Sequence, residues 1–151
     1  EALKKLCALC ARGEHSEGEM LQKMRLWGIS DEAQARIMKK LVDNQFVDDE
    51  RYCRMFINDK LNFNQWGRRK IEQALIQKGV ARQTYQPMLN EIGSDEWVAI
   101  LQPLIEAKRK TIRTASPYEL KMKLIRFAMS RGFEMREINI CIDQTGIDDD
   151  F

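Results

Sequence analysis

Residues 24–29 read MRLWGI, and a similar pattern returns as LIQKGV at 75–80 and AMSRGF at 128–133. Each segment ends an apolar helical stripe with a glycine and a following apolar residue, and these glycines are Gly28, Gly79 and Gly132. They lie 51 and 53 residues apart, a period typical of tandem supersecondary units. Because a tandem array offers a long surface rather than one deep pocket, the repeat favours a binding protein.

Apolar residues recur at helical spacing along the whole chain, and no segment alternates convincingly with the period of a strand. Ser16 and Ser116 are each followed three residues later by glutamate, the capping-box pattern that opens a helix. The sequence therefore predicts an all-α fold. We expect three tandem three-helix units at 1–47, 48–93 and 94–151, with a middle helix about one turn longer in the third unit. Pro103 predicts a kink or break in the helix that contains it.

The composition indicates a folded protein, since 44% of the 151 residues are apolar and 32% are charged. No apolar run approaches the roughly 20 residues that a membrane span requires. Glu1 already belongs to a helical pattern, so we expect no secretory signal and a cytoplasmic location. Most of the four cysteines lie in apolar stripes, which suits buried thiols in a reducing compartment.

The net charge is only +2, but the charges are unevenly distributed. Residues 51–90 carry eight Lys and Arg against two Asp and Glu, and residues 103–136 carry nine against three. This uneven charge indicates an anionic partner, either a nucleic acid or an acidic protein surface.

Motifs for enzymatic chemistry are scarce. The sequence contains no phosphate-binding glycine loop, no zinc-protease motif and no nucleophile elbow, and His15 is its only histidine. Cys7 and Cys10 have metal-ligand spacing but lack a second pair. The acidic runs 48–49 and 148–150 could bind a divalent ion, although such runs are more typical of helix starts and solvated tails. We predict no catalytic residue, no metal and no cofactor.

The basic clusters are more informative. Arg68, Arg69 and Lys70 lie in the first turn of a predicted helix, where the macrodipole disfavours cations. An anion there could meet both the side chains and free backbone amides, although a solvated polar face is the alternative. The first candidate patch comprises Arg51, Arg54, Lys60, Arg68, Arg69, Lys70 and Lys78, and the second comprises Lys108, Arg109, Lys110, Lys121, Lys123, Arg126 and Arg131.

Four motifs resemble the RecX family: HSEGEM at 15–20, NQFVDDERYC at 44–53, GRRKIEQAL at 67–75 continuing to KGV at 78–80, and RGF at 131–133. They cover nearly the whole chain in the family's order and spacing. The resemblance implies three tandem three-helix repeats in an extended, curved array. It also implies a non-catalytic regulator, acting as a monomer, that binds the groove of a RecA–DNA filament and restrains recombinase, ATPase and co-protease activity.

The chain departs from the family pattern at a few positions. Cys53 stands where the family usually has alanine, Pro103 is unexpected, and no markedly basic N-terminal extension is present, which would lower direct affinity for DNA. A second hypothesis stays open beside the resemblance, a stand-alone helical repeat protein that binds single- or double-stranded nucleic acid. That hypothesis requires an affinity for bare DNA that falls steeply with salt.

Overall fold

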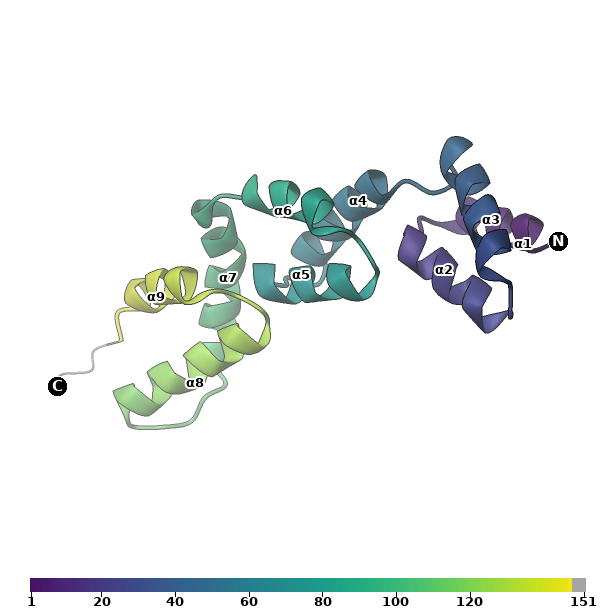
Figure 1. Ribbon diagram of the computed structural model, residues 1–151. Helices are drawn as coiled ribbons and strands as arrows, with labels where there is room; N and C mark the ends of the chain where they lie inside the picture. Colours follow the sequence, from purple (N-terminus) through teal and green to yellow (C-terminus); the bar gives the residue numbers. More distant parts are fainter. Residues whose placement is uncertain (148–151) are drawn as a thin grey trace. The chain divides into compact units, whose positions relative to one another are not determined.

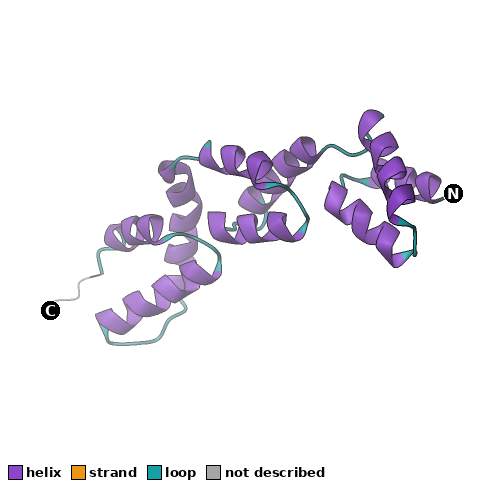
Figure 2. Ribbon diagram, in the orientation of Figure 1, coloured by secondary structure: helices purple, strands orange, loops and turns teal. Residues whose placement is uncertain are grey.

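The computed structural model describes residues 1–147, which form nine α-helices and no strand (Figure 1, Figure 2). The helices are α1 Ala2–Arg12, α2 Glu17–Leu26, α3 Asp31–Asp43, α4 Asp49–Asn62, α5 Arg68–Gln77, α6 Arg82–Asn90, α7 Ser94–Arg109, α8 Pro117–Ser130 and α9 Met135–Gln144. The all-α prediction is confirmed for these residues.

The chain packs as two compact units. Unit 1 comprises Glu1–Ile57 with Ala74–Met88, and unit 2 comprises Asn58–Gln73 with Leu89–Phe151. The second predicted three-helix unit contributes to both of them, so the boundaries 1–47, 48–93 and 94–151 stay a prediction, as does the curvature of the array.

In unit 1, the core between α1, α2 and α3 is formed by apolar side chains at helical spacing. Leu6, Met20, Met24 and Leu41 are fully buried there. The local signals in the sequence behave as predicted. Ser16 accepts from the Glu19 N–H at 3.1 Å, and Glu19 accepts from the Ser16 N–H at 3.0 Å, which completes the capping box.

In unit 2, α9 packs against both α7 and α8 (Figure 1). The buried side chains between them include Leu101, Leu124 and Ile138, and the Trp97 ring meets Phe133 edge-on. The middle helix α8 has 14 residues against 10 in α2, so the predicted extra turn is confirmed.

Of the kink or break predicted at Pro103, the break is wrong, because α7 continues through it from Ser94 to Arg109, and the kink stays a prediction. Proline cannot donate a hydrogen bond to the carbonyl four residues earlier, at Ala99. Both residues lie on the exposed side of α7, where water can bond to that carbonyl. Leu101 and Ile105 are fully buried on either side of the proline and hold the helix in place.

The second predicted capping box forms only in part. Ser116 accepts from the Glu119 N–H at 3.2 Å, but its own N–H donates to the Thr114 hydroxyl. The Glu119 carboxylate instead accepts from Thr114 and pairs with Lys123 at 3.1 Å. These two nearby donors compete successfully for the glutamate.

Each unit contains one close approach between two glycines. In unit 1, a Cβ atom on Gly18 would lie 2.3 Å from the Lys78 oxygen, beside Gly79. In unit 2, a Cβ atom on Gly67 would lie 2.3 Å from the carbonyl carbon of Gly132. We call these contacts the unit 1 joint and the unit 2 joint. The repeated glycine thus ends a helix with a positive φ, 77° at Gly79 and 95° at Gly132, and also admits a neighbouring backbone.

Candidate functional site

The start of α5 carries the first predicted basic cluster. Arg69 is exposed while Ile71 and Leu75 are fully buried, so Arg69 faces solvent as predicted, whereas Arg68 and Lys70 are half-buried. The backbone amides, however, are not all free. The Gly67 N–H donates to the Arg131 oxygen at 2.7 Å, and the Arg69 N–H donates to the Gly132 oxygen at 3.0 Å. The unit 2 joint therefore already uses two of the amides around the predicted anion site, and whether the cluster binds an anion stays a prediction.

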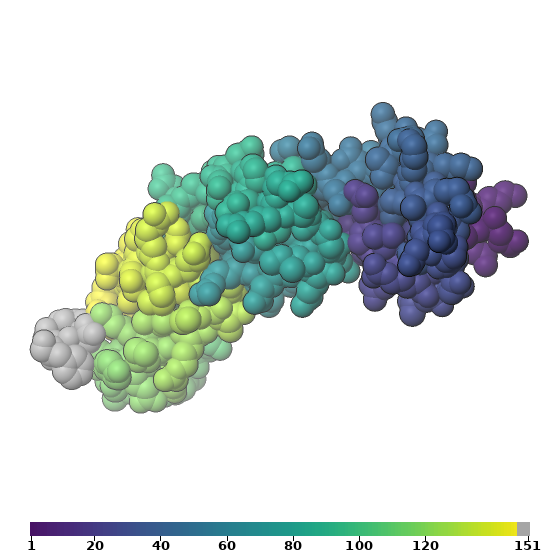
Figure 3. All heavy atoms as spheres, viewed as in Figure 1, coloured from purple at the N-terminus to yellow at the C-terminus, as the bar shows by residue number. Residues whose placement is uncertain are grey.

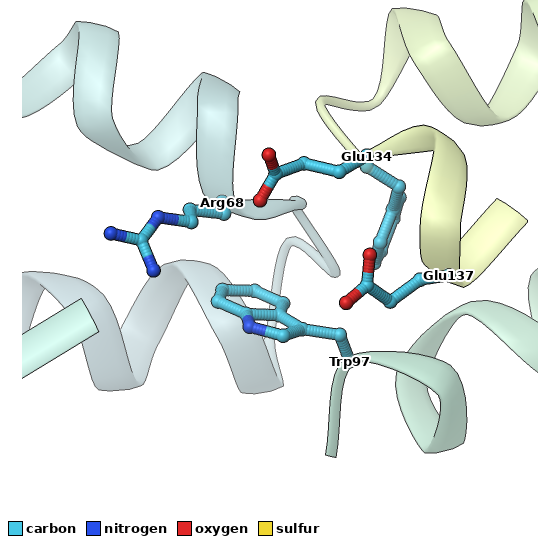
Figure 4. Close-up of a pocket in the computed structure, with 5 residues that line it drawn as sticks. Arg68, Trp97, Glu134 and Glu137 are labelled. Atoms are coloured by element: carbon cyan, nitrogen blue, oxygen red, sulfur yellow. The ribbon is translucent and has the colours of Figure 1, made fainter. Parts of the chain in front are cut away.

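The Arg68 side chain is engaged by polar side chains of the same unit. Its guanidinium donates to Asn90 Oδ1 at 2.6 Å, and its Nε lies 3.9 Å from Glu72. A narrow cavity beside it is lined by Arg68, Trp97, Phe133, Glu134 and Glu137. In Figure 4, the Arg68 guanidinium points away from Glu134 and Glu137, and the Trp97 ring lies below the two glutamates. Since carboxylates line this cavity, it does not favour an anion.

Trp66 holds two other cations of the first patch. The ammonium groups of Lys60 and Lys70 each lie 4.8 Å from the centre of the Trp66 ring. An ammonium over an indole face is attracted by the quadrupole of the ring. The two lysines are therefore gathered at the turn between α4 and α5.

The second predicted patch surrounds an open hollow of about 490 Å³ between α7 and α8. We call it the α7–α8 hollow, and its lining residues are Lys108, Thr111, Ile112, Arg113, Lys123 and Arg126. Four of the six are cations and none is an acid. The surface of α8, green in Figure 3, adjoins that of α9 in yellow. Cations gathered around a concavity raise the local concentration of anions.

One acid lies near the hollow without lining it. Glu119 pairs with Lys123, and hydrogen bonds from Lys123 and Thr114 hold the pKa of Glu119 below its usual value. Glu119 therefore stays ionised and offsets part of the Lys123 charge. Arg113 and Arg126 are exposed and make no hydrogen bond or ion pair within residues 1–147, which leaves them open to a partner.

Several other predicted cations bond within the fold. Arg51 pairs with Glu14 at 2.7 Å, and Lys78 pairs with Glu19 at 3.2 Å. Arg109 donates to the Thr145 oxygen.

The Arg131 side chain also bonds within the fold, since it donates to the carbonyls of Asn64 and Gln65. Arg54 and Lys110 are exposed and form no hydrogen bond or ion pair in the described part of the chain, and Lys121 is half-buried. Whether Arg54 extends the cluster at Arg68 stays a prediction, because the two lie in different units.

The cysteine and acidic motifs adopt ordinary structural roles. Burial raises the pKa of the Cys53 and Cys141 thiols to about 11, and burial is also the main cause that raises the pKa of Cys10. At the start of α4, Asp48 and Asp49 accept backbone N–H groups from Arg51 and Glu17. Within residues 1–147, no group of three or more His, Cys, Asp and Glu side chains is placed to hold a metal ion. The acidic run 148–150 lies outside the described residues.

No helix in residues 1–147 is both long and apolar enough to cross a lipid bilayer.

Two residues of interest were missed by the sequence analysis. Arg113 lines the α7–α8 hollow, and its signal was its place at the end of the run KRKTIR at 108–113. Phe63 is 78% exposed in the turn after α4. It sits outside the repeated motifs, between two asparagines, so no periodic signal marks it.

The fold and these surfaces define a class, the all-helical repeat proteins with solvent-facing basic surfaces. Residues 48–86 match the family model described as the second three-helix domain of RecX, and residues 94–142 match the third three-helix domain. Together these matches cover more than half of the chain. The chain belongs to the RecX family.

Individual relatives agree with this family assignment. The chain is 29% identical to regulatory protein RecX of Lactobacillus johnsonii over 130 residues, and 31% identical to that of Clostridium perfringens strain SM101 over 120 residues. These matches cover 86% and 78% of this chain but only 48% and 56% of the relatives. The chain thus spans about half the length of these curated relatives.

Two solved structures share the fold. The crystal structure of a regulatory protein RecX has a TM-score of 0.87 over 94% of this chain and 71% of its own. That of RecX from Lactobacillus salivarius has a TM-score of 0.83 over 95% of this chain and 93% of its own. Both are 19% identical to this chain, which supports the fold alone.

Proposed function

We propose that this protein is a non-catalytic regulator of a RecA-type recombinase. It binds the groove of the RecA–DNA filament in the cytoplasm, as a monomer, and restrains recombinase, ATPase and co-protease activity. It would thereby act in recombination, DNA repair and the SOS response. Membership of the RecX family supports this proposal, as does the name regulatory protein that its relatives carry.

The observation that carries the proposal is the α7–α8 hollow. Its four cations come from the end of α7, the following loop and α8, and no acid lines it. A RecA–DNA filament presents phosphates, and we expect it to present acidic protein surface as well, so either component suits this hollow. The exposed Arg69 at the start of α5 is a second contact point.

The test is a titration of RecA ATPase on single-stranded DNA with the protein and its variants. Arg113→Glu with Arg126→Glu reverses two exposed charges of the hollow. We expect inhibition to weaken by at least about tenfold, as the loss of charge complementarity at an interface would cause.

The matched control is Arg36→Glu with Lys40→Glu, which reverses two exposed charges on α3 in unit 1. This control should inhibit like the parent protein. If the Arg113→Glu, Arg126→Glu variant kept the circular dichroism spectrum of the parent and still inhibited fully, the α7–α8 hollow would have no part in the mechanism. No effect of the parent protein on RecA would contradict the proposed function itself.

A second candidate is a stand-alone nucleic-acid-binding protein, which the same basic hollow favours. It requires binding to bare duplex or single-stranded DNA whose affinity falls steeply as salt rises. The absence of such binding at about 50 mM salt would dismiss this candidate.

A further inference from the structure

Phe63 lies in the turn between α4 and α5. With 78% of its surface open to water, it is the most exposed of the large apolar side chains in residues 1–147. A single exposed apolar residue is ordinary on a protein surface. The setting of Phe63 is what distinguishes it.

The backbone around Phe63 is fixed by hydrogen bonds. The Phe63 N–H donates to the Asp59 oxygen at 2.9 Å, and the Trp66 N–H donates to the Lys60 oxygen at 3.0 Å, which closes the turn around the ring. The guanidinium of Arg131 donates to the next two carbonyls, at Asn64 and Gln65. A partner would therefore meet a ring whose backbone needs no further ordering, and this lowers the cost of binding.

Cations are held in the same turn. Trp66 positions the ammonium groups of Lys60 and Lys70, each 4.8 Å from its ring centre. Arg69 beside Lys70 is exposed. We call residues 60–70 the Phe63 corner. It combines one open aromatic face with positive charge on both sides of it in the sequence.

We propose that the Phe63 corner binds single-stranded nucleic acid, with a base stacked on Phe63 and neighbouring phosphates paired with Lys60 and Lys70. Proteins that bind single strands without reading sequence combine these two elements, aromatic rings for bases and cations for phosphates. An unpaired strand can offer a base face to the ring, whereas the bases of a duplex stack on one another. The inference rests on the proposed function, because it names the component of a RecA–DNA filament that this corner touches.

The test needs no RecA. Binding of the full chain to a fluorescent thymidine oligonucleotide of about 15 nucleotides is followed by anisotropy at about 50 mM salt. Phe63→Ala should bind about tenfold more weakly, which is within the range measured for the loss of one stacked base. Phe63→Tyr keeps the ring and should bind like the parent protein. Phe63→Leu keeps apolar surface without a ring and should bind like the alanine variant.

Leu26→Ala is the matched control, since Leu26 is 77% exposed and lies in unit 1. It should leave the affinity unchanged. Lys60→Gln with Lys70→Gln should reduce the slope of log affinity against log salt by about 1.4, the value for two phosphate contacts on a single strand. The exposure of Phe63 means that its variants keep the fold, and circular dichroism checks this.

Several results would overturn the proposal: no binding of the parent protein to the oligonucleotide, equal affinity of the parent and Phe63→Ala, or parent-like binding by Phe63→Leu. An equal loss on a duplex of the same length would also overturn it. If Phe63→Ala weakened RecA inhibition but not oligonucleotide binding, the ring would belong to a contact with a protein pocket instead. A parent protein that binds the oligonucleotide but leaves RecA unaffected would contradict the proposed function and not the strand contact.

Discussion

The unit 1 joint and the unit 2 joint share a geometry but differ in the bonds that hold them. In unit 1, the Ser16 hydroxyl donates to the Lys78 oxygen at 2.6 Å, and Lys78 pairs with Glu19. In unit 2, two backbone N–H groups, of Gly67 and Arg69, donate to backbone carbonyls after α8. Side chains alone therefore hold the first joint, whereas backbone bonds together with the Arg131 side chain hold the second.

The two joints also explain why some predicted binding residues act within the fold. Lys78 and Arg131 each directly precede the repeated glycine, and each bonds back across its joint, Lys78 to Glu19 and Arg131 to the carbonyls before Gly67. A cation at this position is a structural part of the repeat. The cations available to a partner are those whose side chains do not bond across a joint.

The largest effect is expected for Gly67→Ala. Its Cβ atom would lie 2.3 Å from backbone atoms of Gly132 and Phe133, which cannot rotate away, and opening the joint would break two backbone hydrogen bonds. We expect a loss of about 3 kcal/mol of unfolding free energy. Gly18→Ala should cost less, about 2 kcal/mol, because only side-chain bonds hold that joint.

Denaturant unfolding would measure both losses, and hydrogen exchange at the Arg69 amide would report on the unit 2 joint. Gly13→Ala is the control, since nothing lies within 4 Å of its added Cβ atom and its φ of 175° is ordinary extended backbone. An equal or larger loss for Gly18→Ala would show that backbone bonding does not distinguish the two joints.

Gly79→Ala and Gly28→Ala separate the two roles of the repeated glycine. Both residues have positive φ, 77° and 71°, so an alanine should cost about 1 kcal/mol in strain at either position. At Gly79 the Cβ atom would also lie 2.9 Å from the Gly18 Cα atom, whereas nothing lies within 4 Å at Gly28. We expect a total of about 2 kcal/mol for Gly79→Ala. Equal thermal stabilities of the two variants would mean that the close approach contributes nothing.

Ser16→Ala and Ser30→Ala make a similar pair for the side-chain bonds of unit 1. Each serine caps a helix, α2 or α3. Only Ser16 is fully buried and also donates to Lys78, whose oxygen would lose this partner. We expect losses of about 1.5 and 0.5 kcal/mol, respectively, from denaturant unfolding. If both variants lost the same unfolding free energy, Ser16 would stabilise unit 1 only by capping α2, and its bond to Lys78 would contribute nothing.

The sequence predicted the features that depend on near neighbours. The Ser16 capping box and the glycine ends of the helices require only residues three to five positions apart, so their spacing is visible in the sequence. The occupied amides at Gly67 and Arg69 could not be predicted, because their carbonyl partners lie more than 60 residues later. The exposure of Phe63 could not be predicted for a related reason. Its exposure depends on what fails to pack against it, which no local pattern records.

The smallest expected effect is a pH dependence of the stability of unit 1, caused by Glu17 and Asp49. Burial raises the pKa of both Glu17 and Asp49 above their ordinary values of 4.5 and 3.8, and the Asp49 charge raises that of Glu17 further. The folded state therefore takes up protons more readily than the unfolded chain. These two acids destabilise unit 1 at neutral pH, and the penalty decreases as the pH falls through their raised pKa values.

Asp49→Asn removes one charge while its amide oxygen can still accept the Glu17 N–H, as Asp49 does at 2.8 Å. We expect the variant to be more stable than the parent protein at pH 7 by about 0.5 kcal/mol or less, since both acids are partly exposed and screened. The gain should shrink as the pH is lowered towards 4.5, because Glu17 and Asp49 then become protonated in the parent. Thermal melting at several pH values measures the trend, with Glu50→Gln as a control that removes an acid from the same turn of α4. A gain that is constant across this range would mean that titration of the pair does not affect the stability of unit 1.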